Sequence, residues 1–485
     1  MKLTVFGTGY VGLVQAVCLA DVGHQVCCID IDSTRVDRLN RGEPVIFEPG
    51  LTPLLQRNLA AQRLHFSSDA SAGIDHADLL FIAVGTPATA EGDADLSQIW
   101  SVADAIARHA RRGKLIVNKS TAPVGTAQEI LRRVRQGLAA RHQRFDIEVV
   151  ANPEFLKEGS AVEDCLRPDR IILGSENPAA LAPLYELYGP FCRNHDKFIV
   201  MDTRSAELTK YAANGLLATK ISFMNEMAEL AERFGADIEL VRKGVGSDPR
   251  IGYHFIYPGC GFGGSCFPKD LKAIRHAAGA CQGDTPLLDA VELVNQRQKH
   301  KLFEKIRHHY HGRLHGKTIA LWGLAFKPQT NDMREAPSRA LIEDLWQAGA
   351  RIRDPKCPRD LKLVAGHRVH RQDSASKRWA SRFANRLRVA LLHDATPDTG
   401  CGLKLIEREL FLQLPYFDHM HRFIPALVQR HGGKTRNHPV NHRPRQAGTS
   451  NYGNLDRALV GILDLFGVWW LIKRTRLNAH TEEVG

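Results

Sequence analysis

The chain has 485 residues, of which 44% are hydrophobic, a share that is ordinary for a soluble globular protein. A chain of this length predicts about three domains. Residues 1–6 are strand-like and lack the basic region and long apolar core of a signal peptide, and the ten cysteines follow no repeating spacing. We therefore expect a reduced protein in the cytoplasm.

The positive charge is concentrated in the last quarter of the chain. Residues 355–485 hold 22 of the 65 Lys and Arg residues and 11 of the 53 Asp and Glu residues, so nearly all of the net charge of +12 lies there. A basic tail can bind nucleic acid or anionic lipid. The abrupt change in composition also indicates a segment of separate origin.

The N-terminal segment has the order of elements that is typical of a dinucleotide-binding fold. Lys2–Phe6 predicts a buried strand, and Gly7-Thr8-Gly9-Tyr10-Val11-Gly12 predicts a tight turn that opens an apolar helix. The glycines let the backbone approach a pyrophosphate at the N-terminus of that helix. A second strand, Gln25–Ile29, ends at Asp30, which can accept a hydrogen bond from a ribose 2′-OH and favours NAD over NADP. The alternative is a chance glycine turn.

Polar residues follow three further apolar runs. These runs predict strands at Leu79–Val84, Leu115–Asn118 and Ile147–Ala151. Thr86, Thr121 and Glu154 come shortly after them. Ligands of open parallel sheets bind beyond the carboxyl ends of the strands, so we expect these three side chains at one site. The alternative is simple turn chemistry, because Thr and Asn also cap helices.

The middle of the chain combines a long helix with a glycine-rich loop. The pattern from Ala206 to about Phe234 predicts a helix on which Lys210 and Asn214, four residues apart, share one face. Three glycines closely precede Cys266. A cysteine near a helix start and near lysines is expected to have a lowered pKa, as a nucleophile requires. The alternative is that Cys266 is a small buried hydrophobic residue.

Four motifs together resemble the UDP-glucose/GDP-mannose dehydrogenase family over about residues 1–353. They are Gly7 to Gly12, Asn152-Pro153-Glu154-Phe155-Leu156-Lys157-Glu158-Gly159, Glu207-Leu208-Thr209-Lys210-Tyr211-Ala212-Ala213-Asn214, and the loop around Cys266. The resemblance implies an α/β protein with an NAD-binding Rossmann domain at 1–200 and a long-helix dimerisation domain at 201–300. It further implies the truncated opening of a second Rossmann-like, UDP-binding domain at 301–354.

The resemblance also implies two successive NAD-dependent oxidations at carbon 6 of a nucleotide sugar, with UDP-glucose as substrate and UDP-glucuronate as product. GDP-mannose or a UDP-N-acetylhexosamine would need only a different pocket, so they remain alternatives. A thiol traps the intermediate aldehyde and later leaves from a thioester, as cysteine chemistry permits. The residues implied are Cys266 as nucleophile, Lys210 for the oxyanion, Asp270 and Thr121 for positioning or deprotonating water, Glu154 as a candidate base, and Asn214 for the sugar or the oxyanion.

The resemblance assigns two groups of binding residues and a partner. Around NAD it places Gly7, Gly9, Val11, Gly12, Asp30, Arg35, Thr86, Thr121, Lys269 and Arg334. Around the nucleotide sugar it places Glu154, Phe155, Leu156, Lys157, Lys210, Asn214, Arg250, Phe255, Ile256, Tyr257, Pro258, Gly259, Gly263 and Lys327. Arg250 would reach into the site of a second subunit, which implies a homodimer. The alternative for Arg250 and Arg35 is a solvated surface arginine.

Residues 355–485 resemble a different family, the polyprenyl-phosphate type of family 2 glycosyltransferase. The similar segments are residues 370–374, 397–404, 439–445 and 452–454, although Asn451 stands where a Lys is usual. The nucleotide-binding sheet and Asp-x-Asp metal motif of that family lie upstream of the matched part, and residues 355–485 do not supply them. We therefore interpret the segment as a fused fragment without glycosyl transfer. The loss of half of the third domain leaves a second hypothesis, an inactive nucleotide-binding chimera.

The apolar run Ala458–Ile472 is short for a membrane span, which needs about 20 residues. It predicts either an interfacial helix on anionic lipid, which would give peripheral membrane contact, or a core helix of the fragment. The run His308-His309-Tyr310-His311 lacks partners at ligand spacing, so we expect a polar helix end there and no metal site. We expect no nucleic-acid partner.

Overall fold

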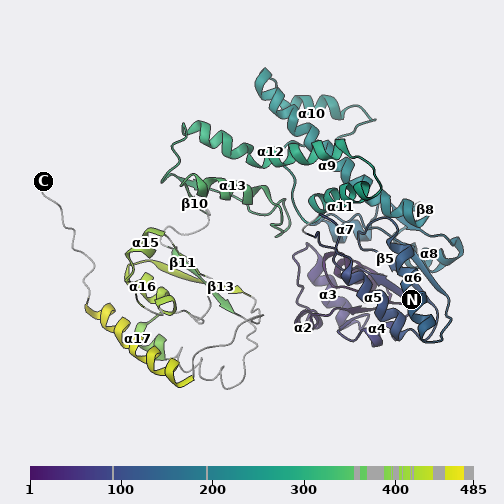
Figure 1. Ribbon diagram of the computed structural model, residues 1–485, viewed down its shortest axis with the longest axis horizontal. Coiled ribbons are helices and arrows are strands. Elements are labelled where there is room, and N and C mark those ends of the chain that lie inside the picture. Colours follow the sequence, from purple (N-terminus) through teal and green to yellow (C-terminus); the bar gives the residue numbers. More distant parts are fainter. Residues whose placement is uncertain are drawn as a thin grey trace. The chain divides into compact units, whose positions relative to one another are not determined.

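The computed structural model describes residues 1–89, 92–192, 195–353, 361–368, 387–394, 396, 404–406, 408–415, 417, 420–440 and 454–474. The chain divides into two compact units, Met1–Ile352 and Arg353–Gly485 (Figure 1). All the residues predicted for chemistry or binding lie in the first unit.

The first unit is built on an eight-stranded sheet in the order β3-β2-β1-β4-β5-β6-β7-β8. The strands are β1 (Lys2–Phe6), β2 (Gln25–Ile29), β3 (Leu64–Ser67), β4 (Leu79–Ile82), β5 (Lys114–Asn118), β6 (Ile147–Ala151), β7 (Ile171–Gly174) and β8 (Phe198–Met201). Strands β1 to β6 are parallel, whereas β7 runs antiparallel to β6 and parallel to β8. The strand order reverses between β1 and β4, and such a switch point opens the crevice in which nucleotides bind.

Helices cover both faces of this sheet. They are α1 (Tyr10–Asp21), α2 (Ser33–Asn40), α3 (Leu51–Ala60), α4 (Ala70–His76), α5 (Ser97–His109), α6 (Thr126–Ala140), α7 (Ala161–Leu166), η1 (Pro178–Leu181), α8 (Ala182–Tyr188) and η2 (Gly189–Phe191). Val5 belongs to the core cluster under α1, and its neighbour Phe6 belongs to the one under α5 and α6. Successive side chains of a strand point to opposite faces, so β1 is buried on both faces from Leu3 to Phe6, as predicted for a buried strand.

A long helix, α9 (Thr203–Phe234), forms the centre of the unit, and its prediction over 206–234 is confirmed. Asp202 caps its N-terminus by accepting a hydrogen bond from Ser205 N at 2.8 Å. Gly235, in the left-handed region at φ 71°, ends it. The helices α10 (Ile238–Gly246), α11 (Phe267–Ala280) and α12 (Pro286–His309) pack on α9 (Figure 1).

A short α/β segment follows, with β9 (Thr318–Ala320), α13 (Pro337–Gln347) and β10 (Arg351–Arg353). The two strands pair with each other. Leu314, Leu341, Leu345 and Ala350 form its small core. This strand–helix–strand order agrees with the predicted opening of a second Rossmann-like domain.

The second unit contains a three-stranded sheet in the order β12-β11-β13. Its elements are β11 (Leu361–Arg368), a helix at 387–392, β12 (Lys404–Ile406), α15 (Arg408–Gln413), η3 (Met420–Arg422), α16 (Ile424–Arg430), β13 (Lys434–Val440) and α17 (Asn454–Arg474). Most of the glycosyltransferase-like motifs, including 370–374, 397–403 and 441–445, lie outside the described residues.

The helix predicted over 458–472 is part of α17. Its Leu465 and Val468 are buried against Leu427 and Val428 of α16 in the core of the second unit. This packing favours a core helix over an interfacial one. Among the residues that the structure describes, no helix is long and apolar enough to cross a membrane.

We expect Gly174→Ala to destabilise the protein, because β7 passes α9 closely at this residue. A Cβ atom on Gly174 would lie 2.5 Å from Ala206 Cβ and 2.9 Å from Asp202 O. Overpacking of this kind costs roughly 1–3 kcal/mol and should lower the melting temperature. Gly244→Ala in α10, where a Cβ meets no described atom within 4 Å, is the control. Equal melting temperatures for the two variants would contradict this account.

Candidate active site

The first half of the site is the glycine turn between β1 and α1. Gly7 has φ 97°, and a Cβ atom there would lie 2.5 Å from Ala83 O. A Cβ on Gly12 would lie 2.0 Å from Gly7 O, so both positions require glycine. At Gly9, by contrast, a Cβ would meet no described atom within 4 Å, and no described side chain caps α1. The N-terminal amides of α1 therefore face open space, as a pyrophosphate site requires.

Asp30 lies at the end of β2 beside this turn. Its Oδ2 accepts hydrogen bonds from Thr8 N at 2.9 Å and Thr8 Oγ1 at 2.6 Å, and Arg35 Nη1 lies 3.3 Å away. Burial opposes the charge, but the hydrogen bonds from Thr8 and Asp32 and the charge of Arg35 together lower the pKa of Asp30. A permanently charged carboxylate here fits the ribose of NAD and repels a 2′-phosphate.

The carboxyl ends of β4 and β5 meet as predicted. Thr86 Oγ1 donates a hydrogen bond to Thr121 O at 2.7 Å. Lys269 Nζ, at the start of α11, lies 3.3 Å from Thr86 Oγ1 and 2.8 Å from Asp270 Oδ1. The loops from these strands and the start of α11 therefore meet at one edge of the sheet.

Glu154, after β6, forms a buried ion pair with Lys210 of α9. Lys210 Nζ lies 3.0 Å from Glu154 Oε1 and donates to Glu154 O at 2.6 Å, while Leu156 N donates to Glu154 Oε2 at 2.7 Å. Burial disfavours both charges, yet their attraction lowers the pKa of Glu154 and raises that of Lys210. Both groups are therefore charged at neutral pH.

Asn214, one turn further along α9, contacts the helix that follows the cysteine. Its Nδ2 donates to Asp270 Oδ2 at 2.6 Å. Asp270 lies in the first turn of α11, where its backbone N donates to Cys266 O at 2.8 Å. Lys210, Asn214, Asp270 and Cys266 are thus brought together by two helices.

A cavity of about 1400 Å³ lies between these elements. Predicted residues that line it are Glu154, Phe155, Leu156, Lys157, Lys210, Asn214, Phe255, Tyr257, Pro258, Gly259, Gly263, Cys266 and Lys327. Ile256 is not one of them, because its side chain is buried close to Gly246 under the loop. Arg250 is also not one of them: its side chain is 87% exposed and pairs with Asp248.

The predicted lowered pKa of Cys266 is wrong for this structure. Burial raises the pKa of the thiol to about 11, and the carboxylates of Glu154 and Asp270 add to the effect. Lys210 and Ser265 act in the opposite direction but do not outweigh burial. The cysteine is the N-cap residue of α11, so the helix start does lie beside it, but the partial burial of its thiol among the loops around the cavity outweighs the effect of the helix start.

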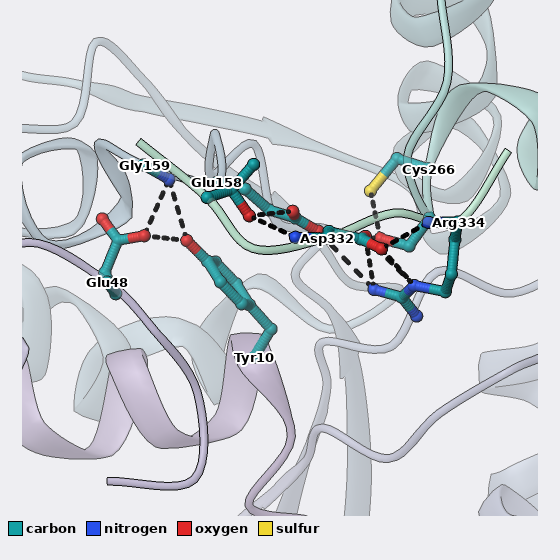
Figure 2. Close-up of polar contacts among 9 residues, drawn as sticks. Tyr10, Glu48, Glu158, Gly159, Cys266, Asp332 and Arg334 are labelled. Atoms are coloured by element: carbon teal, nitrogen blue, oxygen red, sulfur yellow. Dashed lines mark hydrogen bonds and ion pairs between the residues drawn. The ribbon is translucent and has the colours of Figure 1, made fainter. Parts of the chain in front are cut away.

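Glu158 is a site residue that the sequence did not single out. Ser265 Oγ donates to Glu158 Oε1 at 2.9 Å, and Thr330 Oγ1 donates to Glu158 Oε2 at 3.1 Å. Figure 2 shows Glu158 close to Cys266, Asp332 and Arg334. Arg334, predicted to bind NAD, pairs with Asp332 at 2.7 Å and lies 3.7 Å from Glu158. The loop before α13 therefore approaches the cysteine. In the sequence, the position of Glu158 four residues after Glu154 could have indicated that it belongs to the site.

Glu48, which precedes α3, holds the loop that carries Glu154 and Glu158. Its carboxylate accepts hydrogen bonds from Gly159 N and Ala161 N, each at 2.7 Å, and from the hydroxyl of Tyr10 in the glycine turn (Figure 2). The dinucleotide turn and the substrate loop are thereby tied to one carboxylate. No periodic pattern of residues indicates this contact in advance.

Glu207, one turn before Lys210 on α9, caps the start of α6. Its carboxylate accepts hydrogen bonds from Gly125 N at 2.6 Å and Ala127 N at 2.8 Å. Burial raises the pKa of Glu207 to about 7. The helix that carries Lys210 is therefore fixed to the end of the Thr121 loop.

These features define a dinucleotide-binding α/β protein with a cysteine on the wall of a large cavity. Three models of the UDP-glucose/GDP-mannose dehydrogenase family match it: the NAD binding domain at residues 1–192, the central domain at 204–297 and the UDP binding domain at 320–383. The chain belongs to this family, and its N-terminal domain is an NAD-binding domain.

Individual relatives and a solved structure support this family membership. The chain is 54% identical over 353 residues to a UDP-glucose 6-dehydrogenase of Pseudomonas aeruginosa. The match covers 73% of this chain and 78% of the relative. It is 47% identical over 376 residues to a UDP-glucose 6-dehydrogenase of Bacillus subtilis, and the match covers 77% of this chain and 84% of the relative. A UDP-glucose dehydrogenase structure from Pyrobaculum islandicum matches with a TM-score of 0.69 and 40% identity, covering 72% of this chain and 80% of that one.

The family match extends further than the sequence motifs indicated. It continues to residue 383, whereas the resemblance in the sequence was placed at about 1–353. It therefore includes residues 370–374, which we grouped with the glycosyltransferase-like segment. No group of three or more His, Cys, Asp or Glu in the described part of the chain could hold a metal ion.

We expect Glu207→Gln to flatten the pH dependence of stability between about pH 4.5 and 7. The folded protein binds this proton more tightly than the unfolded chain does, because burial raises the pKa of Glu207 from 4.5 to about 7. The contribution to stability is therefore complete below the unfolded pKa and is lost as the pH rises through the folded one, a change on the order of 3 kcal/mol.

Melting temperatures of the two proteins between pH 4.5 and 8 measure this difference. Glu186→Gln, at an exposed position of α8, is the matched control. A slope in the Glu207→Gln variant as steep as in the parent would show that the carboxyl group does not titrate there.

Proposed function

We propose that this protein oxidises UDP-glucose to UDP-glucuronate in an NAD-dependent, four-electron reaction. The observation that carries the proposal is the convergence of Cys266, Lys210 and Asn214 on one cavity next to an NAD-binding domain. The named relatives of 54% and 47% identity, both UDP-glucose 6-dehydrogenases, support UDP-glucose over other nucleotide sugars.

Each of these residues has a separate role in the proposed reaction. Two molecules of NAD⁺, bound in turn, each accept one hydride from carbon 6. The Lys210 ammonium, held by Glu154, stabilises negative charge on the oxygen of carbon 6. Asn214 orients that oxygen or the sugar and is itself fixed by Asp270. Thr121, linked to Thr86, helps to position water.

Cys266 separates the two oxidations. After the first oxidation its sulfur adds to the aldehyde carbon and forms a thiohemiacetal, so the aldehyde remains bound. Loss of the second hydride converts the thiohemiacetal to a thioester, and water then releases the carboxylate and the thiol. Glu154 and Asp270 lie near enough to the sulfur to affect its pKa and are the candidates for activating that water.

The proposed binding residues form two groups, one for NAD and one for the nucleotide sugar. Gly9, Val11, Asp30, Arg35, Thr86 and Lys269 are proposed for NAD, supported by the open glycine turn and the charged Asp30. The loop 154–157, the loop 255–263 and Lys327 are proposed for the nucleotide sugar, supported by their position along the cavity. Arg334 lies beside Glu158, so we propose a role near the reacting groups for it as well as contact with NAD.

A homodimer through α9 is the second part of the proposal. Leu216, Phe223, Leu230 and Phe234 are exposed and recur at intervals of seven, seven and four residues, which places them along one face of the helix. An apolar stripe of this length on a helix surface marks a contact with another chain. Arg250, exposed and held by Asp248, is available to reach the site of the second subunit.

The remaining proposals concern the C-terminal part and the location. We keep a fused, glycosyltransferase-like segment after residue 383 as a proposal, supported by the basic composition of residues 355–485. A cytoplasmic location is supported by the eight cysteines in the described part of the chain, all of which are free thiols. We do not propose membrane contact, because α17 packs into a core.

Purified protein with NAD⁺ and UDP-glucose should form two NADH per sugar. In Cys266→Ser the serine hydroxyl is a poor aldehyde trap, so turnover should stop after the first oxidation. Absorbance at the NADH maximum measures both, and GDP-mannose and a UDP-N-acetylhexosamine are the comparison substrates. If one of these sugars is oxidised faster, the substrate assignment is wrong. If folded protein binds NAD⁺ but oxidises none, the chimera hypothesis replaces the proposal.

Phe223→Asp should convert the dimer to a monomer, because it places a charge in the centre of the apolar stripe. Sedimentation velocity gives the mass of each variant directly. Leu412→Asp, at an exposed position of the second unit, is the matched control and should leave the mass unchanged. A parent protein that is already monomeric at micromolar concentration would contradict the proposed interface.

A further inference from the structure

The thiol of Cys266 needs a proton acceptor before it can attack a carbonyl group. Burial raises its pKa to about 11, so the sulfur carries a proton at neutral pH. The thiolate is the nucleophilic form, and a positioned base can remove the proton as the sulfur attacks. The acceptor must lie within hydrogen-bond reach of the sulfur, directly or through one intervening group.

Three ionisable groups beside the thiol are poorly suited to this task. Lys210 already carries its proton, because Glu154 and its other neighbours raise the pKa of the amine despite its burial. Glu154 uses Oε1 for Lys210 and Oε2 for Leu156 N, and these contacts lower its pKa despite burial. Asp270 is bound by Asn214 at one oxygen and paired with Lys269 at the other.

Ser265 offers a route to a fourth group. Its Oγ lies 3.6 Å from Cys266 Sγ and donates a hydrogen bond to Glu158 Oε1 at 2.9 Å (Figure 2). A hydroxyl group has one proton to donate, and here that proton points at the carboxylate. Either atom can donate in the contact between sulfur and oxygen, and a relay to Glu158 uses the arrangement in which the thiol donates to Ser265 Oγ.

We propose that Ser265 and Glu158 form a proton relay for Cys266. The thiol proton passes to Ser265 Oγ while the hydroxyl proton of Ser265 passes to Glu158 Oε1. The electron pair left on sulfur forms the bond to the aldehyde carbon, and the carbonyl π pair moves to the oxygen beside Lys210. When the thioester is hydrolysed, the leaving thiolate takes the proton back along the same path. The inference rests on the proposed function, because it assigns the attack to Cys266.

The surroundings of Glu158 suit a terminal acceptor. Burial and the nearby Asp332 raise the pKa of this carboxyl, which makes it a stronger base than an exposed glutamate. Thr330 Oγ1 at 3.1 Å and Arg334 Nη2 at 3.7 Å keep it bound in place, and the Lys327 ammonium also faces it. Glu158 must be ionised to act, so the relay should fail as the pH falls through its raised pKa.

The test is the rate at which iodoacetamide alkylates Cys266 between pH 5 and 9, in the full chain without substrate. Peptide mass spectrometry separates Cys266 from the exposed Cys281, which serves as internal reference. Glu158→Gln keeps the size of the side chain and an oxygen for Ser265, but it accepts no proton. We expect alkylation at neutral pH to slow by roughly 10²-fold.

The sign of the effect distinguishes a relay from simple electrostatics. Removing a negative charge near a thiol favours the thiolate, so a purely electrostatic role of Glu158 predicts faster alkylation in Glu158→Gln. A purely structural role predicts no change in the pH profile. Alkylation as fast as in the parent, or faster, would overturn the proposal. Glu176→Gln removes a carboxylate that accepts two hydrogen bonds from Thr203 far from the cavity, and it should alkylate like the parent.

Two variants of Ser265 show whether slower alkylation is caused by loss of the relay or by a folding defect. Ser265→Thr retains the hydroxyl and should keep most of the parent rate, whereas Ser265→Ala should be as slow as Glu158→Gln. If Ser265→Ala alkylates as fast as Ser265→Thr, no relay passes through this hydroxyl. With NAD⁺ and UDP-glucose, Glu158→Gln should release its first NADH at the parent rate and its second more slowly. Absence of any NADH from the parent would refute the proposed function without touching the alkylation result.

Discussion

The buried ion pair between Lys210 and Glu154 is the contact on which the site depends, because it joins α9 to the end of the central sheet. Both side chains are about 5% exposed, so the two charges can be tolerated only together. Removing one partner of such a pair typically costs roughly 3–5 kcal/mol, since the other charge remains buried without compensation. Glu207 and Asn214, one turn to either side of Lys210, connect the same face of α9 to α6 and to α11. A single helix face thereby fixes the NAD-binding domain, the ammonium and the cysteine helix relative to one another.

Two of the carboxylates around the cavity differ in the environment that sets their charge. Glu154 pairs with a lysine, which lowers its pKa, whereas Glu158 lies beside Asp332, and burial raises its pKa. Acid and base roles in active sites are commonly separated in this way, because environments push the pKa values of similar groups apart. The spacing of four residues puts both carboxylates on one loop, and Glu48 holds that loop against the glycine turn. The position of this loop therefore couples the nucleotide end of the site to its reacting end.

Most of the fold could be predicted from the sequence because it follows from local patterns. Lys2–Phe6, the glycine turn and the helix ending at Phe234 are read from periodicity and steric rules, and the structure has them where expected. The ends of β4, β5 and β6 also meet, since neighbouring parallel strands align their carboxyl ends. The pKa of Cys266 could not be predicted in the same way. It depends on burial by loops that lie 60 to 110 residues away along the chain, among them the one that carries Glu158. The position of Arg334 beside Glu158 and the burial of Ile256 away from the cavity could not be predicted for the same reason.

The residues proposed to contact the reacting groups all precede Arg353, where the second unit begins. The loop from Lys327 to Arg334 is the part of the third domain that approaches Cys266, through Thr330 and Glu158. It is anchored by Gly264 N, which donates to Arg334 O at 2.8 Å, and by the ring of Phe326 against Gly264, where any Cβ would lie 2.7 Å from that ring. These contacts belong to the first unit and do not require the residues after 383. The contacts around Cys266 are therefore complete within the first unit.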